Sequence, residues 1–357
     1  MSQANPVSGV SRAMDVRLVT PAPPGSRKGN RVTATRWARF LRELGHRVRV
    51  VEGYRGGRCD LLVALHARRS YEAIARFRER HPEKPLLVAL TGTDLYGDIR
   101  SDPLAQRSLE WATRLITLQP LGVEELPAHL RGKVRVIYQS CAPPPGRFAP
   151  RRDAFEVCVM GHLRAVKDPF RTAEAARLLP ASSGVRVLHL GGPLEDGMAE
   201  RAQAEMAANP RYRWLGDLPR WRALRVLARS RLLALTSIME GGANVVTEAL
   251  AVSVPVVSSR IPGSIGLLGP DYPGYFPVGD TAALAALLHR AETDAALYAE
   301  LEDRCGRLRR LADPAQERRT WRALLGELAG EQAAAPTGAE TTGAETTGAA
   351  KTGRRVA

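Results

Sequence analysis

The chain has 357 residues, 44% of them apolar, which is enough for two globular domains with ordinary hydrophobic cores. Its formal net charge of +15 attracts polyanions, yet only 5% of the residues are aromatic and the arginines are spread over nearly every predicted helix. This composition argues against dedicated nucleic-acid binding, in which basic groups alternate with aromatic side chains that stack on bases.

Residues 1–13 lack the apolar core of a signal peptide, and no run approaches the roughly 18 apolar residues that a membrane span requires. We therefore expect a disordered leader over residues 1–13, no stable membrane association and a cytoplasmic location. The four cysteines agree with a reducing compartment, since they lie far apart and form no CxxC pair that would suggest a zinc site or a disulfide framework.

Residues 14–140 alternate short β-rich runs with segments of helical period. The predicted strands cover residues 16–20, 47–51, 60–66, 85–90, 114–119 and 133–140, and two predicted helices cover residues 31–45 and 70–81. This alternation is typical of βαβ units on a parallel sheet, so we expect a first α/β domain here.

Residues 141–153 are rich in proline and charge and are predicted to form a linker. A second α/β series follows over residues 154–330. Its predicted strands cover residues 155–160, 185–190, 212–216, 231–237 and 254–259, and closing helices cover 281–330. Asp168 and Pro169 predict a helix start, with the aspartate as N-cap. The tail, residues 331–357, repeats TGAET and is too polar and glycine-rich to bury a core, so we expect it to be disordered.

Two parallel-sheet domains leave a cleft between the carboxyl ends of their strands, where α/β proteins usually bind ligands. The strand-to-helix loops are therefore the candidates for function. The stretch EGGANVVTEAL, residues 240–250, follows directly on a buried strand and places Gly241 and Gly242 at a helix start. Glycines let backbone N–H groups approach a ligand, and the positive end of the helix dipole favours a phosphate.

Two carboxylates flank this helix start, Glu240 before it and Glu248 eight residues later. Carboxylates would repel a bare phosphate but accept two hydrogen bonds from vicinal hydroxyls. The ligand should therefore carry an anion in its middle and diols at both ends, as a nucleotide-sugar does. Glu248 would bind the ribose, the glycines the diphosphate, and Glu240 with Asn244 the hexose. In the structural alternative, Glu240 is a first-turn acid favoured by the helix dipole and Glu248 a solvated surface residue.

The loop GHLRAVK, residues 161–167, also joins a strand to a helix start. Gly161 opens it, and Arg164 and Lys167 are placed to neutralise a diphosphate as it leaves. No two aspartates stand two residues apart in the DxD arrangement that would hold a divalent ion. We therefore expect neither metal nor cofactor, and a leaving group stabilised by these cations and the helix terminus.

The loop PAPPGSRKGN, residues 21–30, precedes the first helix and holds Gly25, Gly29 and Asn30 in a flexible turn. It matches neither GxGxxG nor GxxxxGK[ST], so neither a dinucleotide fingerprint nor an NTPase loop is supported. We assign these three residues to donor binding, with a surface loop as the alternative.

His66 ends one predicted strand, Thr93 and Asp94 follow another, and all three would face the same cleft if the sheet is parallel. The alternatives are a satisfied structural histidine and an aspartate that caps a turn. The candidate catalytic residues are His66, Glu240, Arg164 and Lys167.

The stretch 240–250, followed by AVSVPVVSS, resembles the donor-site signature of family 4 glycosyltransferases. The resemblance implies the GT-B fold: two Rossmann-like domains facing across a cleft, a donor site mostly in the second, no metal requirement, and a final helix that crosses back to the first. The family's G-R-L-x-x-x-K pattern corresponds to residues 161–167, with His162 in place of its arginine and Arg164 as the candidate replacement. Its HG-D loop corresponds to TGTD, with Thr91 in place of histidine.

Several stretches resemble one subgroup more closely, the selenosugar synthases of selenoneine biosynthesis. Among them are TPAPPGSRKGNRVTATRWARFLRELGHRV, ALTGTDLYGDI, GHLRAVKDPF and RIPGSIGLLGPDYPGYFPVGD. This likeness implies that selenophosphate attacks the anomeric carbon of a UDP-sugar, UDP-N-acetylglucosamine or UDP-glucose, giving a selenosugar with loss of UDP and phosphate. Selenophosphate arrives already ionised, so such a reaction requires no strong general base.

An anionic acceptor needs positive charge beside the donor. The residues assigned to acceptor binding are Arg27, Lys28, Arg31, Thr93 and Asp94, with Arg260 as a further candidate; for each cation the alternative is a solvated surface group. Two other hypotheses remain open. One is a family 4 enzyme that glycosylates a hydroxyl of a lipid or small molecule, and the other is an inactive, basic nucleic-acid-binding protein whose binding falls steeply with salt.

Overall fold

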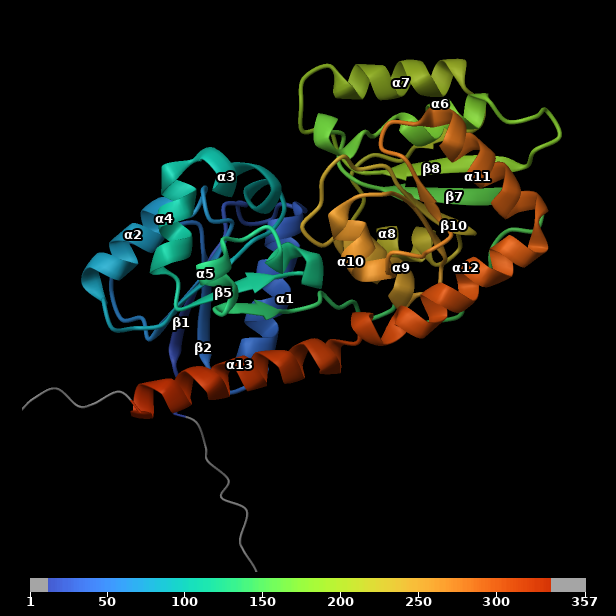
Figure 1. The fold of residues 1–357 in the computed structure, drawn as a ribbon. Helices are drawn as coiled ribbons and strands as arrows, with labels where there is room; N and C mark the ends of the chain where they lie inside the picture. The colour runs from blue at the N-terminus through green and yellow to red at the C-terminus, as the bar shows by residue number, and fades with distance from the viewer. Residues whose placement is uncertain (1–11, 335–357) are drawn as a thin grey trace, which may run out of the picture.

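The computed structural model describes residues 12–334, and Figure 1 shows them as two α/β domains joined by an irregular segment. Within these residues there are two six-stranded sheets, ordered β2-β1-β3-β4-β5-β6 and β12-β11-β10-β7-β8-β9. All of the pairings between these strands are parallel. The prediction of two Rossmann-like parallel-sheet domains is confirmed.

The strands of the first domain follow the predicted apolar runs. They are β1 (Asp15–Val19), β2 (Arg47–Val51), β3 (Leu61–Leu65), β4 (Leu86–Ala89), β5 (Arg114–Thr117) and β6 (Val134–Val136). Its helices are α1 (Gly29–Glu43), α2 (Tyr71–Arg80), α3 (Ile99–Ser101), α4 (Pro103–Trp111) and α5 (Ala128–Arg131), with a π-helical turn at Asp94–Asp98 and a 3-10 turn at Pro120–Val123. Every residue of β3 and β4 is buried, because helices cover both faces of a parallel sheet.

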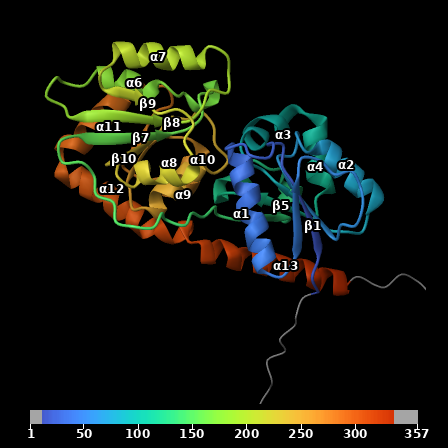
Figure 2. The ribbon, with the colours of Figure 1, turned by 180° about the vertical axis from the view of Figure 1, so that it is seen from behind.

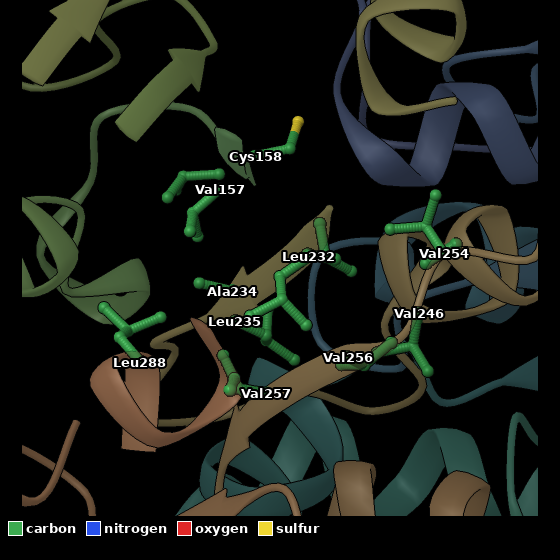
Figure 3. Close-up of a cluster of buried hydrophobic side chains, with 14 of the residues drawn as sticks. Val157, Cys158, Leu232, Ala234, Leu235, Val246, Val254, Val256, Val257 and Leu288 are labelled. Atoms are coloured by element: carbon green, nitrogen blue, oxygen red, sulfur yellow. The ribbon is translucent and has the colours of Figure 1, made fainter. Parts of the chain in front are cut away.

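The second domain repeats this construction. Its strands are β7 (Phe155–Met160), β8 (Val185–Leu190), β9 (Tyr212–Trp214), β10 (Leu232–Leu235), β11 (Val256–Ser259) and β12 (Tyr275–Phe276). Its helices are α6 (Arg171–Arg177), α7 (Met198–Ala208), α8 (Arg220–Leu227), α9 (Asn244–Ala251), α10 (Pro262–Leu268), α11 (Thr281–Thr293) and α12 (Ala295–Leu308), with 3-10 turns at Ala165–Lys167 and Arg309–Ala312. Figure 3 shows Val246 of α9 in the same apolar cluster as Leu232 and Val256 of the sheet, so the core fixes this helix against β10 and β11.

The strand order of each sheet reverses beside its first strand. β1 lies between β2 and β3, and β7 lies between β8 and β10. Neighbouring strand-to-helix loops diverge at such points and leave a crevice at the carboxyl ends of the strands. The loops concerned follow β1, β3, β7 and β10, and they contain residues 21–30, His66, residues 161–167 and residues 240–243. Topology therefore places the predicted functional loops at the two crevices.

The closing helix α13 (Pro314–Ala334) packs on the first domain. Figures 1 and 2 show it leaving the second domain and running along the first. The side chains that it buries in the first domain's core are Trp321, Leu324, Leu325 and Leu328. The ring of Trp321 meets that of Trp37 edge to face, 5.0 Å between centroids. Residues 314–330 were expected in the second domain by sequence order, but their contacts assign them to the first, as the family resemblance implies for its final helix.

Two local predictions are wrong. Helix α6 begins at Arg171, not at Pro169, and Asp168 does not cap it. Asp168 has a left-handed backbone (φ 43°), and its carboxylate accepts a hydrogen bond from Arg171 Nε at 2.7 Å, so the side chain binds a guanidinium rather than the helix N–H groups. The short strand β12 was also missed, since two residues carry no periodic signal.

The predicted leader and tail lie largely outside the described residues. Arg12 and Ala13 have no regular structure, whereas residues 331–334, expected to be disordered, continue helix α13. Among the helices of residues 12–334, none is both long and apolar enough to cross a bilayer.

Candidate functional site

Loops from both domains enclose a cleft of about 970 Å³. The predicted site residues that line it are Arg27, Lys28, Gly29, Asn30, Arg31, His66, Thr93, Gly161, Arg164, Lys167, Glu240, Gly242, Asn244 and Glu248. Gly25, Asp94 and Gly241 do not line it, nor does Arg260, which is exposed and lies over the ring of Tyr275. The fold therefore brings most of the predicted residues to one place, from loops up to about two hundred residues apart in the chain.

Glu240 stands where β10 leads into α9, and its side chain is only 11% exposed. Its Oε1 accepts a hydrogen bond from Ser237 Oγ at 2.7 Å and pairs with the Lys167 ammonium. This ion pair joins the loop after β7 to the loop after β10, the two loops that flank the crevice of the second sheet. The two predicted loops thus form one charged surface.

Glu248 lies inside α9 and is 3% exposed, so the alternative of a solvated surface residue is wrong. Its carboxylate pairs with the guanidinium of Arg220, the first residue of α8. Burial raises the pKa of Glu248, and the positive charge of Arg220 opposes that rise. Arg220 was not predicted from the sequence, where its only signal is a basic residue directly after the turn sequence DLP, a common surface pattern.

The start of α9 is open to a ligand. Within residues 12–334, no side chain caps this helix, and none of its first-turn residues is acidic. The first N–H groups of a helix have no partner in the helix itself and carry its positive partial charge. The start of α9 therefore has the properties expected of an anion-binding helix terminus.

The two glycines before α9 bring this loop against the first domain. A methyl group on Gly241 would lie 2.6 Å from the carbonyl carbon of Thr91, and one on Gly242 would lie 2.5 Å from Leu118 Cβ. Only a residue without a side chain fits at these two contacts. The sequence predicts that these glycines let a ligand approach the backbone closely. At Gly241 the close neighbour is instead the backbone of the first domain.

The loop after β7 is held by bonds to its neighbours. Gly161 accepts a hydrogen bond at its carbonyl oxygen from His189 Nε2 at 3.0 Å. His162, which stands where the family has arginine, accepts from the Gly192 N–H at Nδ1, and its Nε2 lies 3.3 Å from the carbonyl oxygen of Arg27. Arg164 lies 3.8 Å from Glu195 and is one-third exposed, so it remains free to reach an anion in the cleft.

The loop before α1 reaches across the cleft. Arg27 Nη1 lies 2.7 Å from both the carboxylate and the carbonyl oxygen of Asp217, in the loop between β9 and α8. The guanidinium assigned to the acceptor is therefore engaged in a bridge between the domains. Lys28 is the N-cap residue of α1, and Arg31 lies in its first turn.

His66 has an unusual backbone for a non-glycine residue, with φ 74°, and is 2% exposed. Its Nδ1 accepts from the Arg69 N–H at 3.3 Å, so Nε2 carries the proton and donates to Thr93 Oγ1 at 3.0 Å. Burial lowers the pKa of His66, and the charge of Asp94 acts against that. The imidazole is therefore neutral near pH 7.

The prediction that Asp94 binds the acceptor is wrong. It is fully buried, and its carboxylate accepts hydrogen bonds from the N–H groups of Thr91, Gly92 and Ala67 at 2.8–2.9 Å. These three bonds shape the loops that follow β3 and β4. Asp94 therefore caps a turn, as the alternative interpretation has it, and its side chain does not line the cleft.

No group of three or more potential ligands for a metal ion occurs in the part of the chain that the structure describes. Arginines and lysines outnumber carboxylates among the residues that line the cleft, and an excess of cations suits anions.

Residues 147–308 match the family model of "Glycosyl transferases group 1". The match covers the second domain from the linker to the end of α12, including both of its crevice loops. No curated protein has significant sequence similarity to the chain.

Solved structures share the whole two-domain arrangement. HepE of Anabaena, in complex with UDP and glucose, has a TM-score of 0.69 at 15% identity and covers 88% of this chain and 100% of its own. The sucrose-phosphate synthase of Thermosynechococcus elongatus has a TM-score of 0.67 at 16% identity, over 89% and 99%. An α,α-trehalose-phosphate synthase of Burkholderia vietnamiensis has a TM-score of 0.61 at 15% identity, over 76% and 73%.

Together with the two parallel sheets, these likenesses confirm the predicted fold.

Proposed function

We propose that this chain, a GT-B protein whose second domain is a group 1 glycosyltransferase domain, transfers a sugar from a UDP-sugar to the selenium of selenophosphate. The proposal for the donor is supported by the open start of α9 between two carboxylates. It is also supported by HepE, a protein of the same fold that was solved with UDP-glucose. The proposed sugar is N-acetylglucosamine or glucose.

The donor would lie along the second-domain wall of the cleft. Its diphosphate meets the first N–H groups of α9, and its ribose hydroxyls meet Glu248, which is buried and needs hydrogen-bond donors. In the structure the carboxylate of Glu248 pairs with Arg220, which would share it with the ribose hydroxyls or move away when the donor binds. The hexose would lie toward Glu240.

The reaction breaks the bond between the anomeric carbon and the diphosphate oxygen, and the electron pair leaves with UDP. Lys167 and Arg164 line the same cleft, and in this proposal their charges stabilise the negative charge that develops on the leaving group. A bond from selenium to the anomeric carbon forms in its place. Water then cleaves the phosphorus–selenium bond, which gives the selenosugar and phosphate.

The proposal of an anionic acceptor rests on one observation, the positive groups at the start of α1 that lack a partner among the described residues. Within the described residues, no side chain caps this helix and its first turn holds no acid, yet Lys28 and Arg31 bring two positive charges to the positive end of its dipole. In the loop and in the first turn of α1, Ser26 Oγ and Arg31 Nη1 are buried without a protein partner among residues 12–334. An anion would satisfy all of these groups.

The two helix starts lie next to each other across the cleft. A methyl group on Gly29, the first residue of α1, would lie 3.7 Å from Nδ2 of Asn244, the first residue of α9. An anion at α1 would therefore stand beside a diphosphate at α9. Because selenophosphate is already ionised, His66 need not act as a base, and we assign it a hydrogen bond from Nε2 to the sugar or the acceptor.

The test is UDP release from UDP-N-acetylglucosamine and UDP-glucose, with and without selenophosphate, together with mass spectrometry of the products. We expect selenophosphate to accelerate UDP release and a product that contains both the hexose and selenium. UDP release that responds only to alcohol acceptors, with no selenium in any product, would instead establish the hydroxyl-glycosylating alternative.

A further inference from the structure

A buried polar cluster at the wall of the cleft ties α1, α13 and the segment after β6, with Gln139 and Ser140, together. Its centre is Arg36, which lies on the inner face of α1 and is 9% exposed, beside Glu317 of α13, which is 2% exposed. Arg36 Nε donates to Glu317 Oε2 at 3.0 Å. The other donors to this carboxylate are Trp37 Nε1 at 2.6 Å and the N–H of Ser140 at 2.7 Å. Glu317 is thereby fixed and presents Arg36 with a rigid acceptor.

The far side of the same guanidinium reaches the donor loop. Arg36 Nη1 donates to Oδ1 of Asn244 at 3.1 Å, and Arg36 Nη2 donates to Oε1 of Gln139 at 2.8 Å. Gln139 in turn donates from Nε2 to the carbonyl oxygen of Gly242 at 2.7 Å. Asn244 Nδ2 lies 3.4 Å from Thr33 Oγ1, also on α1. Two residues of the α9 start are therefore held by the first domain.

This arrangement needs an arginine and not only a positive charge. Arg36 uses three different nitrogens for three acceptors, on α13, on the segment after β6 and on α9. A planar guanidinium supplies N–H groups in fixed directions, whereas a lysine ammonium is a single point on a flexible stem. Burying an ion pair is also a poor route to stability, because desolvation offsets most of the attraction. The cluster is better explained by the geometry that it imposes.

We propose that Arg36 is a positioning residue for the donor site, resting on the proposed function: it aligns the start of α9 for the diphosphate by holding Asn244 and, through Gln139, Gly242. Asn244, assigned from sequence to the hexose, then acts as the point at which the first domain holds the donor loop. Glu317 of α13 orients the guanidinium of Arg36, and that guanidinium orients Asn244. The diphosphate site therefore forms only when α13 packs on the first domain.

The experiment uses UDP as the probe, because UDP has the diphosphate but no hexose. Calorimetry would compare the wild type with Arg36→Lys, Asn244→Ala and the double variant, all well below their melting temperatures. The matched control is Arg318→Gln, which removes an exposed ion pair between α13 and α1, 2.9 Å from Arg318 Nη1 to Glu43, without touching the donor loop.

We expect Arg36→Lys and Asn244→Ala each to weaken UDP binding about tenfold, the loss typical of broken buried hydrogen bonds. The double variant should be no weaker than the worse single variant, because both changes break one linkage. The control should bind UDP within about twofold of the wild type, as exposed ion pairs contribute little.

Unchanged UDP affinity in Asn244→Ala, with a raised KM for UDP-glucose, would overturn the proposal, because Asn244 would then contact the hexose only. Effects that multiply in the double variant would overturn it too. Asn244→Ala leaves no charge buried, so it tests the linkage even if Arg36→Lys fails to fold. A wild-type protein that binds no UDP would refute the proposed function itself.

Discussion

The two walls of the cleft differ in how completely the protein satisfies its own charges. On the second-domain wall, Glu240 pairs with Lys167 and Glu248 pairs with Arg220, and both carboxylates are buried or nearly so. On the first-domain wall, Lys28 is exposed, and Arg31 keeps a buried nitrogen that no described residue pairs. The charges of the second-domain wall are already paired, whereas the first-domain wall has cations that lack an anion among the described residues.

This difference indicates different binding modes. A nucleotide that enters the second-domain wall exchanges one set of partners for another, since hydroxyls and phosphates replace ion pairs. An anion that enters the first-domain wall adds partners to groups that have none. We therefore expect affinity for the donor to depend on many coupled residues, and affinity for the acceptor to depend on a few cations and on ionic strength.

Lys167→Met should have the largest effect. It removes the charge beside the leaving group and leaves Glu240 unpaired next to the diphosphate, so kcat should fall about 10²–10³-fold, as for loss of a transition-state contact. Steady-state UDP release would measure this. Lys133→Met, in the first domain and away from the cleft, is the control and should retain full activity. If kcat were unchanged in Lys167→Met, the charge of Lys167 on the second-domain wall would play no part in the chemical step.

Acid should weaken the second-domain wall through His189, which donates to the carbonyl oxygen of Gly161. Burial lowers the pKa of His189 from 6.5 to about 4. Because the folded pKa lies below the unfolded one, the stabilisation is present above pH 6.5 and is lost as the pH falls toward 4. The loss amounts to about 3 kcal/mol. Urea denaturation between pH 7 and pH 4 would reveal it, and His189→Gln should flatten that pH dependence. An equal slope in the variant would assign the acid sensitivity to other groups.

Glu248→Ala should weaken UDP binding by about 1–3 kcal/mol, because the ribose hydroxyls lose their acceptor and Arg220 loses its partner. Glu248→Gln separates these two causes, since it keeps one acceptor oxygen and removes the charge. Calorimetry at constant salt would measure both. If neither variant changed UDP affinity, Glu248 would be a structural counter-ion of Arg220 and nothing more.

Arg31→Met should have the smallest effect and the most selective one. It removes one of several cations at the start of α1, so the KM for selenophosphate should rise about tenfold while the affinity for UDP stays the same. The rise should shrink at high salt, since partly exposed charges are screened. A parallel loss of UDP affinity would show that the two walls do not bind separate anions.

Much of this site could be predicted from sequence because its central motif is local. Glu240, Gly242 and Glu248 lie within nine residues, and the strand-to-helix pattern around them predicts a crevice loop. Topology, with the order reversals beside β1 and β7, then brought the other predicted loops to the same cleft. Asp94 illustrates the limit, because a carboxylate at a strand end can equally cap a turn.

The residues that were missed act through contacts between distant segments. Arg36 and Glu317 are 281 residues apart, and no local pattern joins them. One signal was present: Arg36 stands on the apolar face of α1, beside Trp37 and Phe40, where a charge requires a buried partner. The identity of that partner depends on how α13 crosses back, which only the fold supplies.

The most direct test of the account is a calorimetric titration of UDP and of inorganic phosphate, the unreactive counterpart of selenophosphate, alone and in each other's presence. We predict that UDP and phosphate bind at two sites without competing. Lys167→Met should weaken UDP binding even when phosphate is bound, and Arg31→Met should weaken phosphate binding even when UDP is bound. Phosphate that binds only by displacing UDP would contradict the account, because the cleft would then hold one anion and not two.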